Sequence, residues 1–403
     1  MDQQEVPRRE RAANASPLRS GPVRLLMVNS TLHIGGAEQV AASLAERVDK
    51  ARFEVRACYL KQPGLIADQM LRAGVNLNPV PGLVPGKRDY LTFLKLRRMI
   101  REHRIEVIHT HDIHGLIDGA LCRLTTPGLR LVHTFHFGNY PHRTRWHKFI
   151  EGTLWRVADG LVAVGNAQAA SIRALYGIPS ERLRVLWNGV DDPQLRQDVA
   201  PPEGVEPSDV PTIASVSTLI PQKGLDYLLE AAALLRDGGD RFRLLIAGQG
   251  RLRETLEAQA ARLGLGDTVK FLGWVPQASQ RMLPLCDIFV QSSRWEAMSV
   301  VVLEAMASGK AHVVTSVGEN PHVVLHEKTG IIVPPGDPQA LARELRRLLR
   351  DPALRASLGG AARARYRELF TTQHMIAAHE ALYAELTRPA RALTDASDVL
   401  HTR

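Results

Sequence analysis

The chain has 403 residues, of which 45% are hydrophobic. A chain of this length is too long for one ordinary hydrophobic core and suits two domains of ~150 to 200 residues each. Its three cysteines, Cys58, Cys122 and Cys286, have no paired spacing, which argues against a disulfide framework or a zinc cage and indicates a reducing compartment. The net charge of +9 arises in the first half, with 28 Lys and Arg against 19 Asp and Glu in residues 1–200 and 23 against 23 in residues 201–403; nucleic acid, an anionic membrane and an anionic substrate are all compatible with it.

Residues 1–21 mix charges of both signs and contain no apolar stretch, so they fit neither a signal peptide nor a membrane anchor. We expect a disordered tail there. The sequence also lacks a run of ~18 apolar residues, the length that crosses a bilayer. These features predict a cytoplasmic protein, with any membrane contact peripheral.

From Val23 to residue 195, short β-rich runs alternate with stretches of helical periodicity. The runs are VRLLMVN (23–29), FEVRACYL (53–60), EVIHTH (106–111), RLVHTFH (130–136), LVAVG (161–165) and RVLWN (184–188). This is the βαβ pattern of a parallel sheet covered on both faces. It predicts a first doubly wound domain over residues 22–195.

Two adjacent glycines, Gly35 and Gly36, separate the first run from a helical pattern. Glycine allows a ligand to approach the backbone closely, and the amides at a helix start bind anions. An ordinary βα turn has the same composition, so this motif alone is weak.

Two segments of the first half combine cations with apolar side chains. KRDYLTFLKLRRMIREHR (87–104) carries seven Lys or Arg against two acids, and RTRWHKFIEGTLWRV (143–157) adds Trp146, Phe149 and Trp155. Basic amphipathic helices lie on anionic lipid, each cation contributing ~1 kcal/mol. A solvated helix face has the same pattern, so peripheral membrane contact is one of two interpretations.

Histidines gather at the ends of two predicted strands, in HTHDIHG (109–115) and HTFH (133–136). No matching ligand set with zinc-like spacing follows, which disfavours a metal site. We expect His111 and His136, at adjacent strand ends, to line a cleft. His109 and His133 are equally compatible with positions in the core.

A stretch with five prolines, residues 192–211, interrupts the alternation. Such a sequence forms neither a helix nor a central strand, and we expect a linker over residues 196–211. The pattern then restarts with TIASVS (212–217), FRLLIAG (242–248), TVKFLGW (268–274), DIFVQSS (287–293), AHVVTS (311–316) and GIIVPP (330–335). A second doubly wound domain over residues 212–372 follows. Two such domains facing each other would enclose one cleft for two substrates.

Lys223 lies in the turn between a strand of this second domain and an amphipathic helix. An ammonium ~4 Å from a phosphate contributes ~4 kcal/mol at an effective dielectric near 20, against ~0.3–1 kcal/mol for a helix dipole. We therefore expect Lys223 to be the largest single stabiliser of a bound diphosphate. A solvated lysine at a helix start is the alternative.

The segment LIAGQGRLRE (245–254) has Gly248 and Gly250 after a strand, as in a dinucleotide fingerprint. Arg253 occupies the third glycine position, and no strand ends in an acidic residue about 20 positions later. A nicotinamide enzyme is therefore not expected.

The most specific signal is a pair of glutamates, Glu296 and Glu304, that bracket seven residues after a predicted strand. Glu304 is the only charge between Ser299 and Gly309, and an unpaired buried carboxylate costs several kcal/mol. Ribose hydroxyls would satisfy it, at ~1.5–3 kcal/mol per bond. Ser299 is expected to cap the helix and leave its first amides to a diphosphate. The alternatives are a strand over Val300–Val302 or a core arginine partner for Glu304.

These motifs resemble glycosyltransferase family 4 over residues 23–387. The matching segments, in chain order, are GGAE (35–38), HTH (109–111), the histidine of HTFH (His136), WNGVD (187–191), PQKG (221–224), AGQG (247–250), FLGWVP (271–276), the Glu-seven-Glu motif and TGIIVPPGD (329–337). The resemblance implies the GT-B fold, with two Rossmann-like doubly wound parallel-sheet domains, the N-terminal one on the acceptor side. A helix over 373–387 is expected to cross back to that domain, with a tail over 388–403.

The resemblance also implies roles for individual residues. His136, Glu296 and Lys223 would be catalytic, with His136 beside the reacting sugar and His111 on the acceptor side. Glu304 would hold the ribose, Glu296 the sugar hydroxyls and Lys223 the diphosphate. The remaining donor-binding residues would be Gly35, Gly36, Thr218, Gly248, Trp274, Val275, Met298, Ser299 and Val300. Members of this family transfer with retention and without a metal, and the sequence has no Asp-x-Asp motif.

Three positions depart from the family. Thr218 stands where an arginine of the diphosphate clamp is common, and losing such a donor costs ~10²–10³ in rate unless Arg294 or another cation substitutes. Ala297 replaces a common glycine, and His322 stands where a glutamate is frequent. The sequence offers no explanation for His322.

We expect a retaining hexosyltransferase that uses a UDP- or GDP-sugar, with no cofactor and no metal. The acceptor would be a glycan or a lipid-linked molecule in cell-surface polysaccharide or glycolipid synthesis, and no nucleic acid is expected as a partner. A nucleotide-sugar epimerase on the same fold and a non-catalytic nucleotide-sugar-binding protein are the alternatives.

Overall fold

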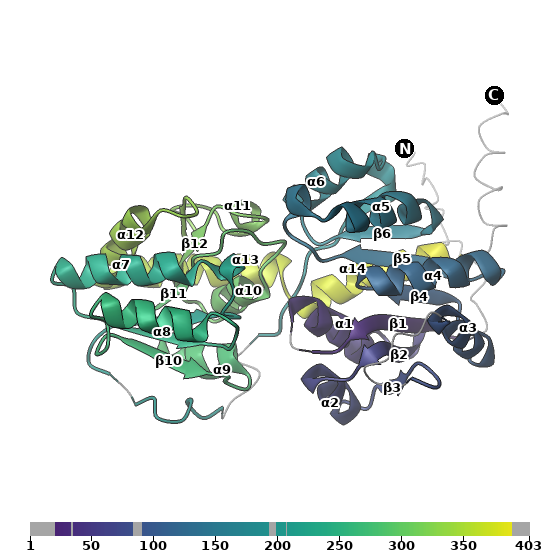
Figure 1. Cartoon of the computed structure of the whole chain (residues 1–403), viewed down its shortest axis with the longest axis horizontal. Helices are drawn as coiled ribbons and strands as arrows, with labels where there is room; N and C mark the ends of the chain where they lie inside the picture. Colours follow the sequence, from purple (N-terminus) through teal and green to yellow (C-terminus); the bar gives the residue numbers. More distant parts are fainter. Residues whose placement is uncertain (1–20, 34, 84–90, 193–198, 207, 389–403) are drawn as a thin grey trace, which may run out of the picture.

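The computed structural model describes residues 21–33, 35–83, 91–192, 199–206 and 208–388. Two parallel sheets with helices packed against them form two lobes that lie side by side (Figure 1). The predicted fold class, two doubly wound α/β units, is confirmed. The expected tails over 1–20 and 389–403 lie outside the described residues, as do parts of the expected linker and residues 87–90 of the first basic segment.

The first sheet has seven strands in the order β3-β2-β1-β4-β5-β6-β7. Strand β3 was not expected from the sequence, because it is only four residues long. The elements are β1 (Val23–Thr31), α1 (Gly36–Arg47), β2 (Phe53–Gln62), α2 (Leu65–Arg72), β3 (Asn76–Pro79), α3 (Thr92–Glu102), β4 (Val107–Thr110), α4 (Ile113–Thr125), β5 (Arg130–Phe135), α5 (Arg145–Leu154), β6 (Gly160–Ala163), α6 (Asn166–Tyr176) and β7 (Leu183–Val185).

The second sheet has six strands in the order β10-β9-β8-β11-β12-β13. Its elements are β8 (Thr212–Val216), the short 3₁₀ helix η5 (Pro221–Lys223), α7 (Leu225–Asp237), β9 (Arg243–Ala247), α8 (Arg253–Arg262), β10 (Val269–Gly273), α9 (Ala278–Met282), β11 (Ile288–Gln291), α10 (Val300–Ala307), β12 (Ala311–Thr315), α11 (Asn320–Val323), β13 (Ile331–Val333), α12 (Pro338–Arg350), α13 (Pro352–Leu369) and α14 (Thr372–Leu386). Val300–Val302 are helical, so the strand alternative for this segment is wrong.

Strand β1 shows why the middle of such a run, here residues 25–28, is apolar without a break. Leu25 and Met27 pack into the core on one face of the sheet, and Leu26 and Val28 into the core on the other. Successive side chains of a strand point to opposite faces, so a strand covered on both faces needs an unbroken apolar run. A parallel sheet buried in this way is what the continuous runs predict.

Helix α14 returns from the second lobe and runs behind the first sheet (Figure 1). Met375, Ile376 and Leu382 join the core of the first lobe. The Tyr383 hydroxyl bonds His109 Nδ1 at 2.7 Å, and Arg52 pairs with Glu380 at 2.7 Å. The last helix therefore binds the two lobes into one unit.

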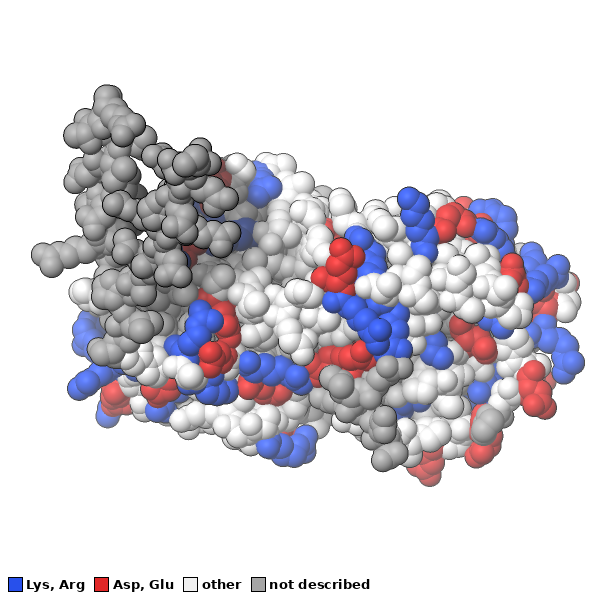
Figure 2. Space-filling model, turned by 180° about the vertical axis from the view of Figure 1, so that it is seen from behind, with Lys and Arg blue, Asp and Glu red and all other residues white. Residues whose placement is uncertain are grey.

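Charges of both signs are distributed over the rear of the molecule. Figure 2 shows Lys and Arg side chains interspersed with Asp and Glu over the described residues of this face. Two ion pairs link segments distant in sequence: Arg47 to Asp191 at 2.6 Å and Arg363 to Asp192 at 3.3 Å. Among the described residues that this view shows, the positive charge is therefore not gathered in one patch.

Each sheet has one point where its strand order reverses. In the first sheet this lies between β1 and β4, and in the second between β8 and β11. Open α/β sheets bind ligands outside the carboxyl ends of the strands at such a point. The loops after these four strands are therefore where a site is expected.

Candidate active site

Lys223 and Glu296 meet at the reversal point of the second sheet. Lys223 ends η5 after β8, and Glu296 lies in the loop after β11. The Lys223 ammonium is 2.6 Å from Glu296 Oε1, which also accepts from the Ser293 hydroxyl at 2.6 Å. Gln222 Nε2 lies 3.4 Å from the other carboxylate oxygen. The Glu296 side chain is buried and the Lys223 side chain is 20% exposed, so a charge pair lies just inside the surface.

Glu304 is on α10, the helix that follows the loop carrying Glu296. Burial, with a smaller contribution from the nearby Asp191 charge, raises the pKa of its carboxyl to about 7, and the hydrogen bond that the Ser279 hydroxyl donates to Oε2 opposes this shift. The predicted need for a polar partner is therefore met by Ser279, at the start of α9, rather than by a core arginine. Sequence reasoning missed Ser279 because nothing near it in the chain is distinctive.

The start of α10 has no side-chain cap. Ser299 occupies the N-cap position, but its hydroxyl is the acceptor of a 2.6 Å bond from Gln291 Nε2. The expectation that Ser299 caps the helix is wrong, because a buried glutamine on β11 takes its oxygen. Met298, the residue before it, is bound to the first lobe, since the Asn188 side-chain amide donates to its carbonyl at 3.4 Å. The first amides of α10 thus have no side-chain acceptor of their own.

The start of α1 lies opposite the start of α10. Gly35 is the N-cap residue of α1 and supplies no side-chain bond. A Cβ placed on Gly36 would lie 3.6 Å from Val300 Cγ2. Two helix N-termini from different lobes therefore face one another, and each carries the partial positive charge that favours an anion.

Two further glycines hold the Glu296 segment between the lobes. A Cβ on Gly138, in the loop after β5, would collide with the peptide that joins Glu296 and Ala297. A Cβ on Gly318, where φ is +53°, would collide with the Glu296 carbonyl from the second lobe. Neither glycine was singled out from the sequence. The signal for Gly138 was its position two residues after His136.

The histidines divide into two groups. His111 Nδ1 lies 3.1 Å from His136 Nε2, with the two rings stacked 5.3 Å apart, so these two lie together as expected. Burial and neighbouring histidines lower the pKa of both, to about 3 for His136, and both rings are neutral at pH 7.

His109 and His133 belong to the core. His109 bonds the Tyr383 and Thr134 hydroxyls, each at 2.7 Å, and His133 bonds the Thr110 hydroxyl at 2.8 Å. Within the part of the chain that the structure describes, no three His, Cys, Asp or Glu side chains are grouped so that they could hold a metal ion.

The other predicted donor-side residues are scattered around the same loops. Thr218 is exposed directly after β8, and Gly248, at φ +145°, packs its backbone against the Ser217 carbonyl. Trp274 is 40% exposed, whereas Val275 is buried. All four lie at or just beyond the carboxyl ends of β8, β9 and β10.

Arg294, suggested as a substitute for the arginine absent at position 218, is bound to a carboxylate of its own lobe in this structure. Its guanidinium binds both carboxylate oxygens of Asp226, at 3.0 and 2.6 Å, and lies 4.3 Å from the centre of the Tyr227 ring. A bidentate carboxylate and an aromatic face hold this cation in place. This pairing does not test whether Arg294 substitutes for the arginine absent at position 218, which stays a prediction.

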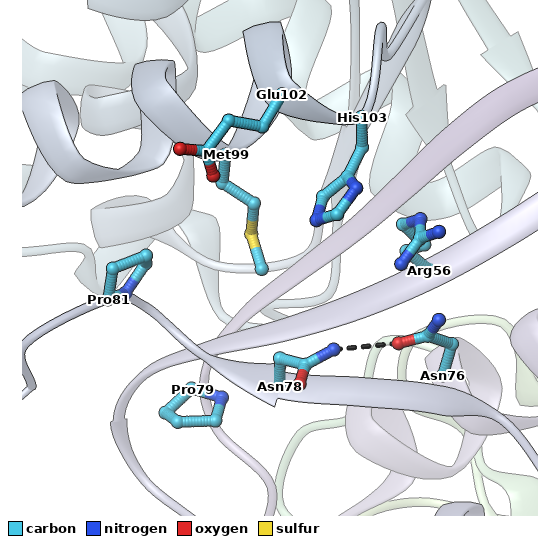
Figure 3. A pocket seen from close by; sticks show the side chains of 8 residues that line it. All are labelled: Arg56, Asn76, Asn78, Pro79, Pro81, Met99, Glu102 and His103. Carbon is cyan, nitrogen blue, oxygen red and sulfur yellow. Dashed lines mark hydrogen bonds between the residues drawn. The ribbon is translucent and has the colours of Figure 1, made fainter.

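A cavity of about 420 Å³ lies elsewhere, between β2, β3 and the end of α3 (Figure 3). Arg56 and His103 point into it, and the Asn78 amide donates to Asn76 at 2.7 Å along its floor. Arg56 is in the first half of β2 and Asn76 begins β3, so the cavity opens near the amino ends of the strands. It takes no part in the site described above.

Comparisons with known proteins agree with this arrangement. Residues 34–193 match the family described as Glycosyltransferase Family 4, and residues 197–365 match that described as Glycosyl transferases group 1. A GDP-mannose-dependent alpha-(1-6)-phosphatidylinositol monomannoside mannosyltransferase of Mycolicibacterium smegmatis is 30% identical over 292 residues, which are 67% of this chain and 74% of that protein. A D-inositol 3-phosphate glycosyltransferase of Jonesia denitrificans is 28% identical over 87% of this chain and 90% of its own length.

Solved structures share the fold. HepE of Anabaena, crystallised with UDP and glucose, superposes with a TM-score of 0.78 at 21% identity, over 90% of this chain and all of that one. Sucrose-phosphate synthase of Thermosynechococcus elongatus superposes with a TM-score of 0.74, also at 21% identity, over 90% of this chain and 99% of that one.

Proposed function

The chain belongs to glycosyltransferase family 4 and has the GT-B fold, and we propose that it transfers a hexose with retention from a nucleoside diphosphate sugar to a glycan or lipid-linked acceptor. One observation carries the proposal. The starts of α1 and α10, neither of which is capped by the side chain of its N-cap residue, lie close together across the lobes, next to the loop in which Lys223 meets Glu296. Helix N-termini beside a lysine form a site of the kind that binds a diphosphate.

The diphosphate would lie between the two helix starts and Lys223. Each helix dipole contributes ~0.3–1 kcal/mol, and an ammonium ~4 Å away contributes ~4 kcal/mol at an effective dielectric near 20. These groups would offset part of the charge of the leaving diphosphate from the protein itself. We therefore propose that transfer needs neither a metal nor another cofactor.

The nucleoside would lie along α10 and the loop after β10. Glu304 has one hydroxyl partner, and its second carboxylate oxygen is the acceptor proposed for the ribose. Trp274 and Val275 would offer backbone groups to the base. A GDP-mannose-dependent relative and a neighbour crystallised with UDP support guanosine and uridine as bases.

The sugar would lie between Glu296 and His136, and the acceptor on the side of His111. In retaining transfer the bond between the anomeric carbon and the phosphate oxygen breaks as the acceptor oxygen bonds to the same face. The leaving phosphate oxygen takes the acceptor proton. The Nε2 of neutral His136 faces His111. Its other ring nitrogen, Nδ1, would then donate a hydrogen bond to the sugar.

The acceptor side carries an apolar surface that supports peripheral contact with an anionic membrane on the cytoplasmic side. The large exposed apolar residues of α3, α4 and α5, together with the residue preceding α3, are Leu91, Leu94, Leu121, Leu124, Trp146 and Phe149. Exposed Arg98, Arg101 and Arg145 are on α3 and α5. Among the described residues, no helix has both the length and the apolar character to span a bilayer.

Thermal shift with UDP-, GDP- and ADP-sugars tests the donor class. A stabilised complex that yields a new glycoside only when an acceptor is present supports the proposal. Altered sugar released without acceptor would indicate an epimerase. Binding with neither transfer nor hydrolysis across a panel of acceptors would indicate a non-catalytic binding protein.

A further inference from the structure

Glu319 is a fully buried carboxylate of the second lobe whose partners are in the first. It lies at the start of α11 with no exposed surface. Its Oε1 accepts from the Asn166 side-chain amide at 3.0 Å and from the Trp187 indole at 3.2 Å, and its Oε2 accepts from the Ala167 amide at 2.9 Å. Three donors from one lobe therefore bind one carboxylate from the other.

This carboxylate caps helix α6 from outside its own lobe. The N-cap residue of α6, Gly165, supplies no side-chain bond, and a Cβ there would collide with the Glu319 carboxylate. Carboxylates are favoured at a helix N-terminus, where orphan amides and the positive dipole end meet. The ion-pair neighbour of Glu319 within the described ranges is His322, 3.7 Å away and half exposed. The bonds to α6 and Trp187 are thus what compensates its burial.

Glu319 is also joined to the segment that carries Glu296. Its backbone amide donates to the Ala297 carbonyl at 2.9 Å. Gly318, the residue before it, packs on the Glu296 carbonyl. A movement of Glu319 therefore displaces the peptide on which Glu296 is placed.

On the opposite side, the capped turn of α6 is joined to the loop that carries His136. Gln168, one residue after Ala167, donates its side-chain amide to the carbonyls of Phe135 and Phe137, at 3.0 and 2.9 Å. These two residues flank His136. Helix α6 thus connects Glu319 to His136 through two sets of hydrogen bonds.

We propose, resting on the function proposed above, that Glu319 is a positioning residue that sets the closed arrangement of the lobes in which Glu296 and His136 face the same donor sugar. Here the carboxylate at position 319 performs the interlobe contact, and His322 is its neighbour. Most of the nucleotide contacts proposed above, from Lys223, Glu304 and the start of α10, belong to the second lobe, and the first lobe adds only the start of α1, at ~0.3–1 kcal/mol. Nucleotide affinity therefore depends little on the Glu319 contact, whereas transfer depends on it.

The test compares Glu319→Gln with Glu327→Gln, which removes an exposed carboxylate of the same lobe that pairs with Arg347. An amide accepts through one oxygen only, so at least one donor of α6 or Trp187 loses its partner. We expect Glu319→Gln to lower kcat at least tenfold while the affinity for UDP or GDP changes less than threefold. Small-angle scattering with nucleotide should show lobes further apart than in the wild type. Glu327→Gln should match the wild type in all three measurements.

A second variant keeps the proposal testable if Glu319→Gln does not fold. Trp187→Phe removes one donor and keeps most of the ring, and should lower kcat in the same direction by a smaller factor. Unchanged kcat and unchanged scattering in either folded variant would overturn the proposal. If the wild type transfers from no donor, the proposed function fails, while the scattering comparison still decides whether Glu319 sets the lobe arrangement.

Discussion

Lys223 lies 2.6 Å from Glu296, although 73 residues separate them, because their loops follow the neighbouring strands β8 and β11. A cation and a carboxylate thus occupy the reversal point of the second sheet. The proposed diphosphate would lie on one side of this pair and the sugar on the other.

Replacing Lys223 by alanine should lower the transfer rate by ~10²–10³, the effect of removing one group that stabilises developing charge. The variant also leaves Glu296 without its cation, so its melting temperature should fall as well. Lys328→Ala, at an exposed position of the same lobe, is the control. Initial rates at saturating donor measure the effect, and a Lys223→Ala rate within threefold of the control would contradict the role.

Glu304 should couple nucleotide binding to pH. Burial raises the pKa of its carboxyl from 4.5 to about 7, so between these values the folded chain holds a proton that the unfolded chain has lost. Stability from this group is present below pH 4.5 and is lost as pH rises through 7. Glu304→Gln should remove that part of the pH dependence, as measured by urea unfolding from pH 5 to pH 8.

The proposed ribose contact of Glu304 should also be measurable as a proton released on nucleotide binding. Hydroxyl donors favour the ionised carboxyl, so binding of UDP or GDP at pH 6.5 should release a proton. Calorimetry in two buffers with different ionisation enthalpies measures it. Proton release that persists unchanged in Glu304→Gln would show that the carboxyl does not hold the ribose.

Gly138→Ala should separate the lobes, because its methyl group would collide with the peptide between Glu296 and Ala297. We expect at least a tenfold loss of kcat with little change in nucleotide affinity. Gly266→Ala is the matched control, since a Cβ there meets nothing within 4 Å and its φ is not positive. The kcat values of both variants are measured by steady-state kinetics. Equal values would show that transfer does not need the close contact between Gly138 and the Glu296 peptide.

Acid should destabilise the first lobe through its buried histidines. Burial lowers the pKa of His379 from 6.5 to about 4. Below pH 6.5 the unfolded chain takes up a proton that the folded chain does not, so stability falls as pH decreases toward 4. His379→Gln should recover up to ~3 kcal/mol of the loss, at 1.36 kcal/mol per pKa unit. Unfolding free energies at pH 7 and pH 4.5 measure the difference, and a variant as acid-sensitive as the wild type would contradict it.

The surface of α3, α4 and α5 should bind anionic lipid. Exchanging Leu124 and Phe149 for serine removes two exposed apolar side chains, and should weaken binding to vesicles with phosphatidylglycerol at least tenfold. Leu325→Ser, exposed on the other lobe, should bind as the wild type does. Wild-type binding that is equal on neutral and anionic vesicles would exclude an electrostatic membrane contact.

Much of the site was predictable because it is local to strand ends. The apolar runs fix which residues follow β8 and β11, and a charged residue placed there lies at the carboxyl edge of the sheet, where folds of this class bind ligands. This is why Lys223, Glu296 and Glu304 could be selected from the sequence. The pairing of His111 with His136 follows from the same rule, because their strands are adjacent.

The sequence by itself determined the two parallel sheets, since strand and helix periodicities are properties of neighbouring residues. Only the tertiary structure showed that Ser299 does not cap α10, that Arg294 is bound to Asp226, and that Gly138 and Glu319 join the lobes. These contacts link residues far apart in the chain, and they depend on how one lobe is seated on the other. Hydrogen bonds and close packing are decided within a few tenths of an ångström, which no pattern of residue types specifies.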